Sequence, residues 1–357
     1  MAFLKIDNVK ISGISAAVPK LVKEIRELPF FGPGEGEKVV ALTKIERSRI
    51  TPPGMCCSDL CYEAADRLLE NLGWDRNDVE ALIYVSLSRD YVTPATSALL
   101  QDRLGLSKEC YCVDIPLACS GYVYGLSNIA SLMQTGNIRK ALLLVGETTS
   151  QLQSPLDKAL WPLHGDAGSA TALEFCKEPE PMYFHLCTDG SRGEAIINVA
   201  GGTRHPVSPD DLVMKDAEDG SKRRAIDSVM DGMNVFGFSI TEPPRSVKEM
   251  CDYFGLNLVN VDYLLLHQAN KYMDDKIGKK LKVDAAKIPF SLYEYGNTSS
   301  TTVPMTIVAG VGPELSGKKV ETVMLGFGSG LSWASAWITL DHTIVLPLIE
   351  LELDEKA

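Results

Sequence analysis

The sequence predicts an α/β protein made of two similar halves packed on each other. Apolar, strand-like segments alternate with helix-like segments along most of the chain. The second half repeats the first: DVEALIYV has a counterpart in NVDYLLLH, and GSATALEF in LSWASAWITL. The 357 residues are enough for two domains of ordinary size, so a duplicated architecture is compatible with the length.

The first half is a series of strands and helices separated by turn residues. Strands are expected at residues 78–88, 111–115, 140–147 and 167–175, and helices at 97–106 and 120–136. In the second of these helices, apolar residues recur at three- and four-residue steps, which predicts one buried face. These residues are Tyr122, Leu126, Ile129 and Met133.

The second half follows the same order. Strands are expected at 260–270, 319–328 and 331–340, helices at 271–282 and 299–312, and an extended piece at 287–297. Alternation of this kind favours mainly parallel pairing. The chain is therefore divided into an N-terminal half (1–175), an insertion rich in charge, glycine and proline (176–230), a C-terminal half (231–340) and a tail (341–357).

Composition narrows the function classes. A net charge of −12 opposes binding to nucleic acid, and no apolar run is long enough to span a bilayer. The start of the chain alternates apolar and polar residues, unlike the apolar core of a signal peptide, so a cytoplasmic location is expected. The nine cysteines lack the paired spacing of a zinc site, which predicts reduced thiols and no metal.

Three residues are candidates for chemistry because each lies at a predicted strand end or helix start, where parallel sheets form their sites. Cys119 stands at the mouth of a helix, whose partial positive charge favours a thiolate at neutral pH. His267 ends a strand, and Asn297 precedes a helix. Taken singly, each has a structural reading as well: a packed cysteine, a core histidine and a turn or capping asparagine.

Four motifs together resemble the β-ketoacyl-acyl carrier protein synthase III family of the thiolase superfamily. They are ACSG around Cys119, HQAN at 267–270, GNTSSTTVP at 296–304 and GFGSGLSW at 326–333. The resemblance implies a five-layer αβαβα fold, a homodimer and a catalytic set of Cys119, His267 and Asn297. It also implies an oxyanion hole made by the backbone N–H groups of Cys119 and Gly328.

The implied reaction is acyl transfer to Cys119, followed by decarboxylative condensation with a malonyl thioester, in fatty-acid or specialised lipid or polyketide synthesis. No cofactor is implied, because the substrates are carried on coenzyme A or on the phosphopantetheine of an acyl carrier protein. Alternatives are a non-decarboxylating acyltransferase of the same fold, a thiol hydrolase and a non-catalytic dimer subunit.

The resemblance also implies contacts outside the catalytic set. Thr93 and Phe236 are expected in the substrate pocket, and the acidic carrier protein is expected to dock on Lys271, Lys276, Lys279 and Lys280. Family members that take acyl groups from coenzyme A carry a tryptophan and an arginine where this chain has Lys38 and Leu42. Two basic positions of the family are replaced, by Tyr272 and Gly237.

Overall fold

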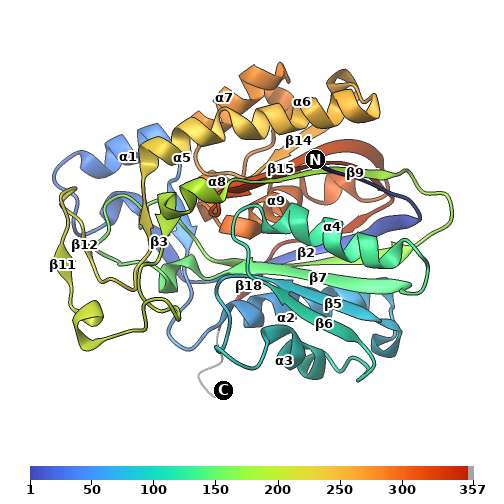
Figure 1. Cartoon of the computed structure of the whole chain (residues 1–357), viewed down its shortest axis with the longest axis horizontal. Helices are drawn as coiled ribbons and strands as arrows, with labels where there is room; N and C mark the ends of the chain where they lie inside the picture. The colour runs from blue at the N-terminus through green and yellow to red at the C-terminus, as the bar shows by residue number, and fades with distance from the viewer. Residues whose placement is uncertain (353–357) are drawn as a thin grey trace.

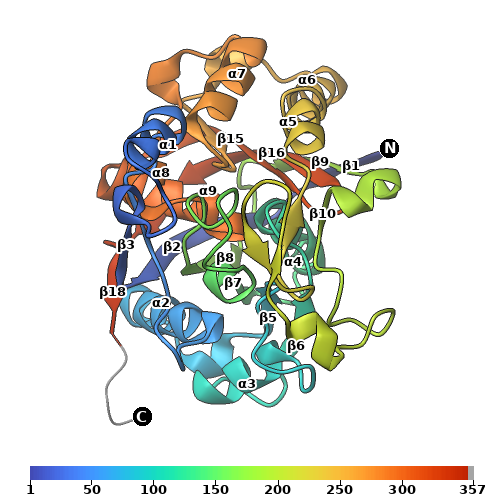
Figure 2. The ribbon, with the colours of Figure 1, turned by 90° about the vertical axis from the view of Figure 1, so that its left-hand side faces the viewer.

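The computed structural model describes residues 1–352. Two mixed β-sheets lie face to face, with helices between them and further helices on both outer faces (Figure 1). Figure 2 shows the layers from the side, with α2 and α3 at the bottom and α6 and α7 at the top. The expected five-layer αβαβα fold is confirmed.

The first sheet has seven strands in the spatial order β17, β2, β8, β7, β5, β6, and β18 also pairs with β2. The bounds are β2 Val9–Pro19, β5 Ala81–Val85, β6 Tyr111–Ile115, β7 Lys140–Glu147, β8 Ala167–Phe175, β17 Ile344–Val345 and β18 Ile349–Leu351.

The second sheet has five strands in the order β1, β9, β16, β15, β14. The bounds are β1 Ala2–Ile6, β9 Met182–Thr188, β14 Tyr263–Leu266, β15 Lys319–Gly328 and β16 Ser332–Asp341. The order β14-β15-β16-β9 repeats β5-β7-β8-β2 of the first sheet, with one parallel and two antiparallel pairs in each. The internal repeat read from the sequence is therefore present in the topology.

Helices complete the layers. The outer ones are α2 Cys57–Leu72 and α3 Thr96–Arg103 on the first sheet, and α5 Gly232–Ser239, α6 Glu242–Phe254 and α7 Lys271–Leu281 on the second. Between the sheets lie α4 Gly121–Met133 and a continuous series of short helical segments, η8 Ser299–Thr301, α9 Thr302–Met305 and η9 Thr306–Val311. Helix α1 Glu35–Thr43 and helix α8 Leu292–Tyr295 lie near a small antiparallel sheet of two strands, β3 Val22–Glu24 and β4 Arg47–Arg49.

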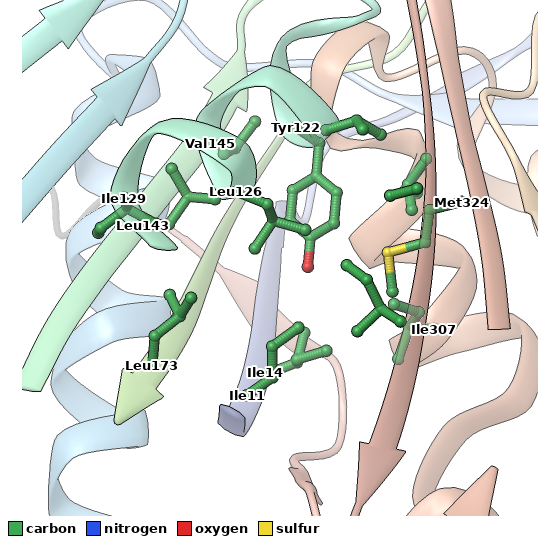
Figure 3. Close-up of a cluster of buried hydrophobic side chains, with 14 of the residues drawn as sticks. Ile11, Ile14, Tyr122, Leu126, Ile129, Leu143, Val145, Leu173, Ile307 and Met324 are labelled. Atoms are coloured by element: carbon green, nitrogen blue, oxygen red, sulfur yellow. The ribbon is translucent and has the colours of Figure 1, made fainter. Parts of the chain in front are cut away.

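The middle layer forms the centre of the core. All four residues expected on the buried face of α4 are inaccessible to solvent, and Figure 3 shows Tyr122, Leu126 and Ile129 packed among side chains of both sheets. Most sides of α4 lie against the two sheets, which explains why the helix is largely apolar, and only a stripe with Asn128 and Leu132 is exposed. The Tyr122 hydroxyl is satisfied by Thr171 Oγ1 at 3.1 Å.

Four sequence-based expectations differ from the structure. Strand β9 lies inside the expected insertion 176–230 but pairs with β1 and β16, so the true insertion begins after Thr188. Part of the expected tail forms β17 and β18, and residues 353–357 lie outside the described residues. The piece 287–297, expected to be extended, contains α8, and both sheets mix parallel with antiparallel pairs.

The insertion folds over one end of the sheets as short elements. These are η4 Gly190–Ala195, β10 Ile196–Ile197, η5 Pro209–Leu212, β11 Lys215–Asp216, β12 Lys222–Arg223 and β13 Val229–Met230. The guanidinium of Arg223 joins it to the body by an ion pair with the fully buried Asp157. The same carboxylate accepts from the backbone N–H groups of Ala159 and Leu160, at 2.7 and 2.9 Å.

Candidate active site

A cavity of about 510 Å³ lies where β6, β7, β14 and β15 end at their carboxyl termini. Much of its wall is apolar, with contributions from Leu87, Leu152, Leu160, Ile196, Val235 and Phe236. A second hollow of about 480 Å³, lined by Leu42 and Tyr272, shares Leu163, Phe236 and Asn270 with it. The two together lead from the surface beside α1 and α7 to Cys119.

Cys119 stands in the turn between β6 and α4, two residues before the helix begins. It lines the cavity, and the hydroxyl of Ser299 lies 3.6 Å from its Sγ. The backbone of Gly328 passes so close that an added Cβ would lie 2.7 Å from Cys119 Cβ and 3.0 Å from Sγ. Only glycine permits that approach, so the end of β15 is held against the thiol.

The pKa of the Cys119 thiol differs from the sequence-based expectation. Burial raises it to about 11, while the hydrogen bond with Ser299 acts in the opposite, lowering direction. The expected thiolate at neutral pH is therefore not what this site favours, because removing the thiol from water outweighs the influence of the helix N-terminus. Cys119 is therefore a thiol at neutral pH.

This pKa predicts a pH profile for alkylation. We expect the rate at which iodoacetamide modifies Cys119 to rise about tenfold per pH unit between about pH 7 and 9, since only the thiolate reacts. The rate is measured by mass spectrometry of the peptide that contains Cys119. The Cys119→Ala variant gives the background from the other cysteines. A plateau below about pH 8 would show that the site stabilises the thiolate after all.

His267 follows β14, and its backbone N–H donates to the Leu325 carbonyl at 2.6 Å, which fixes it beside β15. Its ring is buried, and the ring centroid lies 5.0 Å from that of Phe327 in an edge-to-face arrangement. Its Nδ1 lies 2.8 Å from Thr302 Oγ1. Burial lowers its pKa to about 3, and the neighbouring His164 contributes to the lowering. The imidazole is therefore neutral at physiological pH.

Asn297 is the third predicted residue, and it also faces the cavity. Its side-chain Oδ1 accepts the Ser299 N–H at 2.8 Å, and its Nδ2 lies 3.3 Å from His164 Nε2. The structure thus brings Cys119, His267 and Asn297 to one cavity, from both halves of the chain.

The other expected site residues divide into two groups. Gly328 and Phe236 line the cavity as expected, but Thr93 does not: it is exposed on the loop after β5. That loop leaves the end of the strand toward solvent, so within one chain Thr93 has no contact with the substrate space. Of the four lysines, Lys271 is paired with Asp275, whereas Lys276, Lys279 and Lys280 are exposed on α7.

Two cavity residues were not predicted from the sequence. Glu147 ends β7, and burial raises its pKa to about 7, although the Leu87 N–H and Ser88 hydroxyl donate to it at 2.8 and 2.7 Å. His164 lies beside Asn297. The sequence offered one signal for each residue. Glu147 is a carboxylate at a predicted strand end, and His164 is one of only five histidines in the chain.

Within residues 1–352, no three His, Cys, Asp or Glu side chains are grouped to hold a metal ion, and all nine cysteines are unpaired. No helix in that part of the chain combines the length and apolar character needed to cross a bilayer.

Relatives match nearly the whole chain. Residues 113–190 match the family model described as 3-oxoacyl-[acyl-carrier-protein (ACP)] synthase III, and residues 251–340 match its C-terminal model. A putative 3-oxoacyl-[acyl-carrier-protein] synthase 3 of Campylobacter jejuni is 32% identical over 340 residues, covering 93% of this chain and 94% of the relative. A β-ketoacyl-[acyl-carrier-protein] synthase III of Streptococcus pneumoniae is 31% identical over 338 residues, covering 93% and 99%.

A solved structure agrees with these relatives. The crystal structure of a 3-oxoacyl-(acyl-carrier protein) synthase from Burkholderia xenovorans superimposes with a TM-score of 0.92 at 32% identity, covering 98% of this chain and 99% of the other. The fold and the site define a condensing enzyme of the thiolase superfamily, an acyltransferase. The chain belongs to the 3-oxoacyl-[acyl-carrier-protein] synthase III family, which confirms the resemblance seen in the motifs.

Proposed function

We propose that this enzyme joins an acyl group held on Cys119 to a malonyl thioester by decarboxylative condensation. The observation that carries the proposal is the convergence of Cys119, His267 and Asn297 on one cavity, with Gly328 held against the thiol. Each group has a chemistry suited to one step: a nucleophile, two neutral hydrogen-bond donors and a backbone N–H.

In the first step, the Cys119 sulfur attacks the carbonyl carbon of an acyl thioester. The bond from that carbon to the donor sulfur breaks, and the thiol proton ends on the leaving thiol, so no proton is lost to solvent. The oxyanion that forms in between is stabilised by the backbone N–H groups of Cys119 and Gly328. The close approach of Gly328 to Cys119 supports this pairing.

In the second step, a malonyl thioester binds and loses carbon dioxide. The electron pair of the broken carbon–carbon bond moves toward the thioester carbonyl, whose oxygen accepts hydrogen bonds from His267 and Asn297. The resulting carbanion attacks the acyl carbon on Cys119, forming a new carbon–carbon bond. The carbon–sulfur bond then breaks, which releases a β-ketoacyl thioester and leaves a Cys119 thiolate that takes up one proton from water to restore the thiol.

His267 can donate only if its cavity-facing Nε2 carries the hydrogen. The Thr302 hydroxyl has one hydrogen and two acceptors in reach, His267 Nδ1 at 2.8 Å and the Ser299 carbonyl at 2.9 Å. We propose that the Thr302 hydroxyl donates its hydrogen to His267 Nδ1. The single proton of the neutral ring is then on Nε2. The low pKa of His267 supports a neutral donor rather than an imidazolium.

We propose an acyl carrier protein as partner. Lys276, Lys279 and Lys280 are exposed on α7, the helix whose first turn supplies Tyr272 to the hollow that leads to Cys119. A local basic face attracts an acidic carrier although the whole chain is acidic.

We also propose a homodimer, formed through the edge of the first sheet. Strand β6 ends that sheet and pairs only with β5 among the described strands. Beside it lie exposed apolar side chains, Tyr111 on the strand itself and Tyr91 and Val92 on the loop after β5. A second copy would pair with the open edge and cover these side chains.

The proposed function is tested by following product and carbon dioxide together. Purified enzyme is given an acyl thioester and a malonyl thioester, and the β-ketoacyl product is quantified by mass spectrometry. We expect one carbon dioxide per product. Acyl transfer to an alcohol or amine without carbon–carbon bond formation would identify the enzyme as a non-decarboxylating acyltransferase instead.

The side chains of the second hollow predict which acyl donor the enzyme prefers. In the second hollow, Leu42 is 68% exposed at a position where binding of coenzyme A would need an aromatic or cationic side chain. Stacking and phosphate contacts each contribute about 1–3 kcal/mol to binding. Their absence should slow acylation from coenzyme A by roughly one to several orders of magnitude. We expect Cys119 to be acylated faster from a carrier protein than from coenzyme A bearing the same acyl group.

The comparison uses the rate of acyl-adduct formation at low and raised salt. Charge reversal at Lys279 and Lys280 should slow only the carrier reaction. Lys318→Glu is the matched control, because Lys318 is exposed just before β15 begins, at the opposite end of that strand from Gly328. Faster loading from coenzyme A would overturn the prediction.

A further inference from the structure

We propose that His164 is a positioning residue for Asn297: its unprotonated Nε2 accepts a hydrogen bond from the Asn297 amide and so holds the other amide N–H toward the substrate carbonyl. The inference rests on the proposed function, because it assumes that Asn297 stabilises the developing enolate. His164 would then act through Asn297, without a bond to substrate of its own.

The backbone brings the two residues together although 133 positions separate them. His164 and Asn297 form an isolated parallel β-bridge. The Asn297 N–H donates to the Leu163 carbonyl at 2.8 Å, and the Gly165 N–H donates to the Asn297 carbonyl at 3.1 Å. The relative position of the two side chains is therefore set by paired backbone hydrogen bonds.

The ring nitrogens of His164 have distinct partners, and this assigns the tautomer. His164 Nδ1 lies 3.0 Å from the Leu160 carbonyl oxygen, which can only accept, so Nδ1 carries the hydrogen. In a neutral ring, Nε2 then presents a lone pair. At 3.3 Å from that lone pair, the group on Asn297 must be the donor, Nδ2.

The surroundings keep the ring neutral. Burial lowers the pKa of His164 to about 4, and the charge of Lys23 adds to the lowering while Asp157 opposes it. Lys23 Nζ itself donates to the carbonyls of Trp161 and His164, at 2.6 and 2.8 Å. A protonated ring would place an N–H against the Asn297 amide donor, and the burial of the ring disfavours that state at neutral pH.

Asn297 is consequently fixed at both ends of its amide. Oδ1 accepts the Ser299 N–H at 2.8 Å, and one hydrogen of Nδ2 is directed at His164, so the amide cannot flip without losing both bonds. One N–H remains for the cavity. Without His164, only the bond to Ser299 would orient the donor, and preorganisation of that donor is what the decarboxylation step requires.

The test compares two partial reactions in matched variants. His164→Phe keeps a ring but removes the acceptor, and His164→Gln places a carboxamide oxygen near the position of Nε2. The rate of Cys119 acylation and the rate of carbon dioxide release from the malonyl thioester are measured separately. We expect His164→Phe to leave acylation within about twofold and to slow decarboxylation by about three- to tenfold, the value of one neutral hydrogen bond. His164→Gln should recover most of this loss.

The same substitutions are repeated in an Asn297→Ala background. If His164 acts through Asn297, the double variant is no slower than Asn297→Ala alone. An additive loss, equal slowing of both partial reactions, or a normal decarboxylation rate in His164→Phe would overturn the inference. If His164→Phe does not fold, His164→Asn takes its place, because it keeps a donor for Leu160 but cannot reach Asn297.

The decarboxylation rate of Asn297→Ala alone distinguishes a failure of the role proposed for Asn297 from a failure of the role proposed for His164. A normal decarboxylation rate in that variant overturns the proposed role of Asn297, and this inference with it. A slowed rate there, with no effect of His164→Phe, overturns the positioning role alone.

Discussion

Cys119→Ala is expected to abolish both the covalent acyl adduct and condensation, with a loss of roughly 10⁴-fold or more. No other cysteine lines the cavity, so none can take over the attack. Intact-protein mass spectrometry after exposure to acyl thioesters measures the adduct, and product formation measures condensation.

The matched control is Cys251→Ala, which removes a buried cysteine of α6 that does not line the cavity. This variant should acquire the acyl mass at the normal rate. An adduct on Cys119→Ala formed as fast as on the unmodified enzyme would show that the nucleophile lies elsewhere, and the proposed first step would be wrong.

His267→Ala and Asn297→Ala are expected to separate the two steps. Each should leave acylation of Cys119 within a few-fold and slow malonyl decarboxylation by about 10²–10³-fold, the usual effect of removing one donor from a developing oxyanion. Release of carbon dioxide from a malonyl thioester is the measurement. His342→Ala, which alters a histidine that is 78% exposed, serves as the control. Unchanged release in both cavity variants would refute this division between steps.

The pH dependence of the His267 donor follows from the pKa of its imidazole. Burial places the pKa of His267 at about 3, so the neutral donor is present throughout the physiological range and is lost only as the pH falls toward that value. The decarboxylation rate should therefore show no inflection from His267 between about pH 5 and 8.

Local patterns predicted most of the elements and the three residues at their ends. The spacing of Tyr122, Leu126 and Ile129 identified the buried face of α4, since periodicity reports burial directly. The positions of Cys119 and His267 followed from the rule that sites form at strand ends. The shared cavity then followed from the parallel strands of the repeat.

Features set by distant contacts were missed. Strand β9 was read as part of an insertion because its neighbourhood is rich in charge and glycine, while its partners β1 and β16 lie far away in sequence. For His164 the only signal was the rarity of histidine in this chain, because the role we propose for it depends on a bridge to the distant Asn297. Thr93, expected in the pocket from its motif position, lies on an exposed loop outside the cavity of a single chain.

The direction of the Cys119 pKa was missed for a related reason. A helix N-terminus is visible in the sequence and favours a thiolate, whereas burial in an apolar cavity depends on walls from several segments. The second effect is larger here, and it becomes visible only when the walls are assembled.

The ion pair between Arg223 and Asp157 has a consequence for how this enzyme can be altered. The groups proposed for catalysis come from strand and helix ends, while one wall of the cavity, including Ile196 and Met230, comes from the insertion. Because this wall comes from a separate segment, we expect a graft of the insertion from a relative to change the shape of the cavity. The exchange must include the segment around Asp157, because its carboxylate orders the turn whose Leu160 carbonyl orients His164. A grafted insertion without a counterpart of Arg223 would leave the buried Asp157 carboxylate with its backbone hydrogen bonds but without its ion pair, three residues from Leu160.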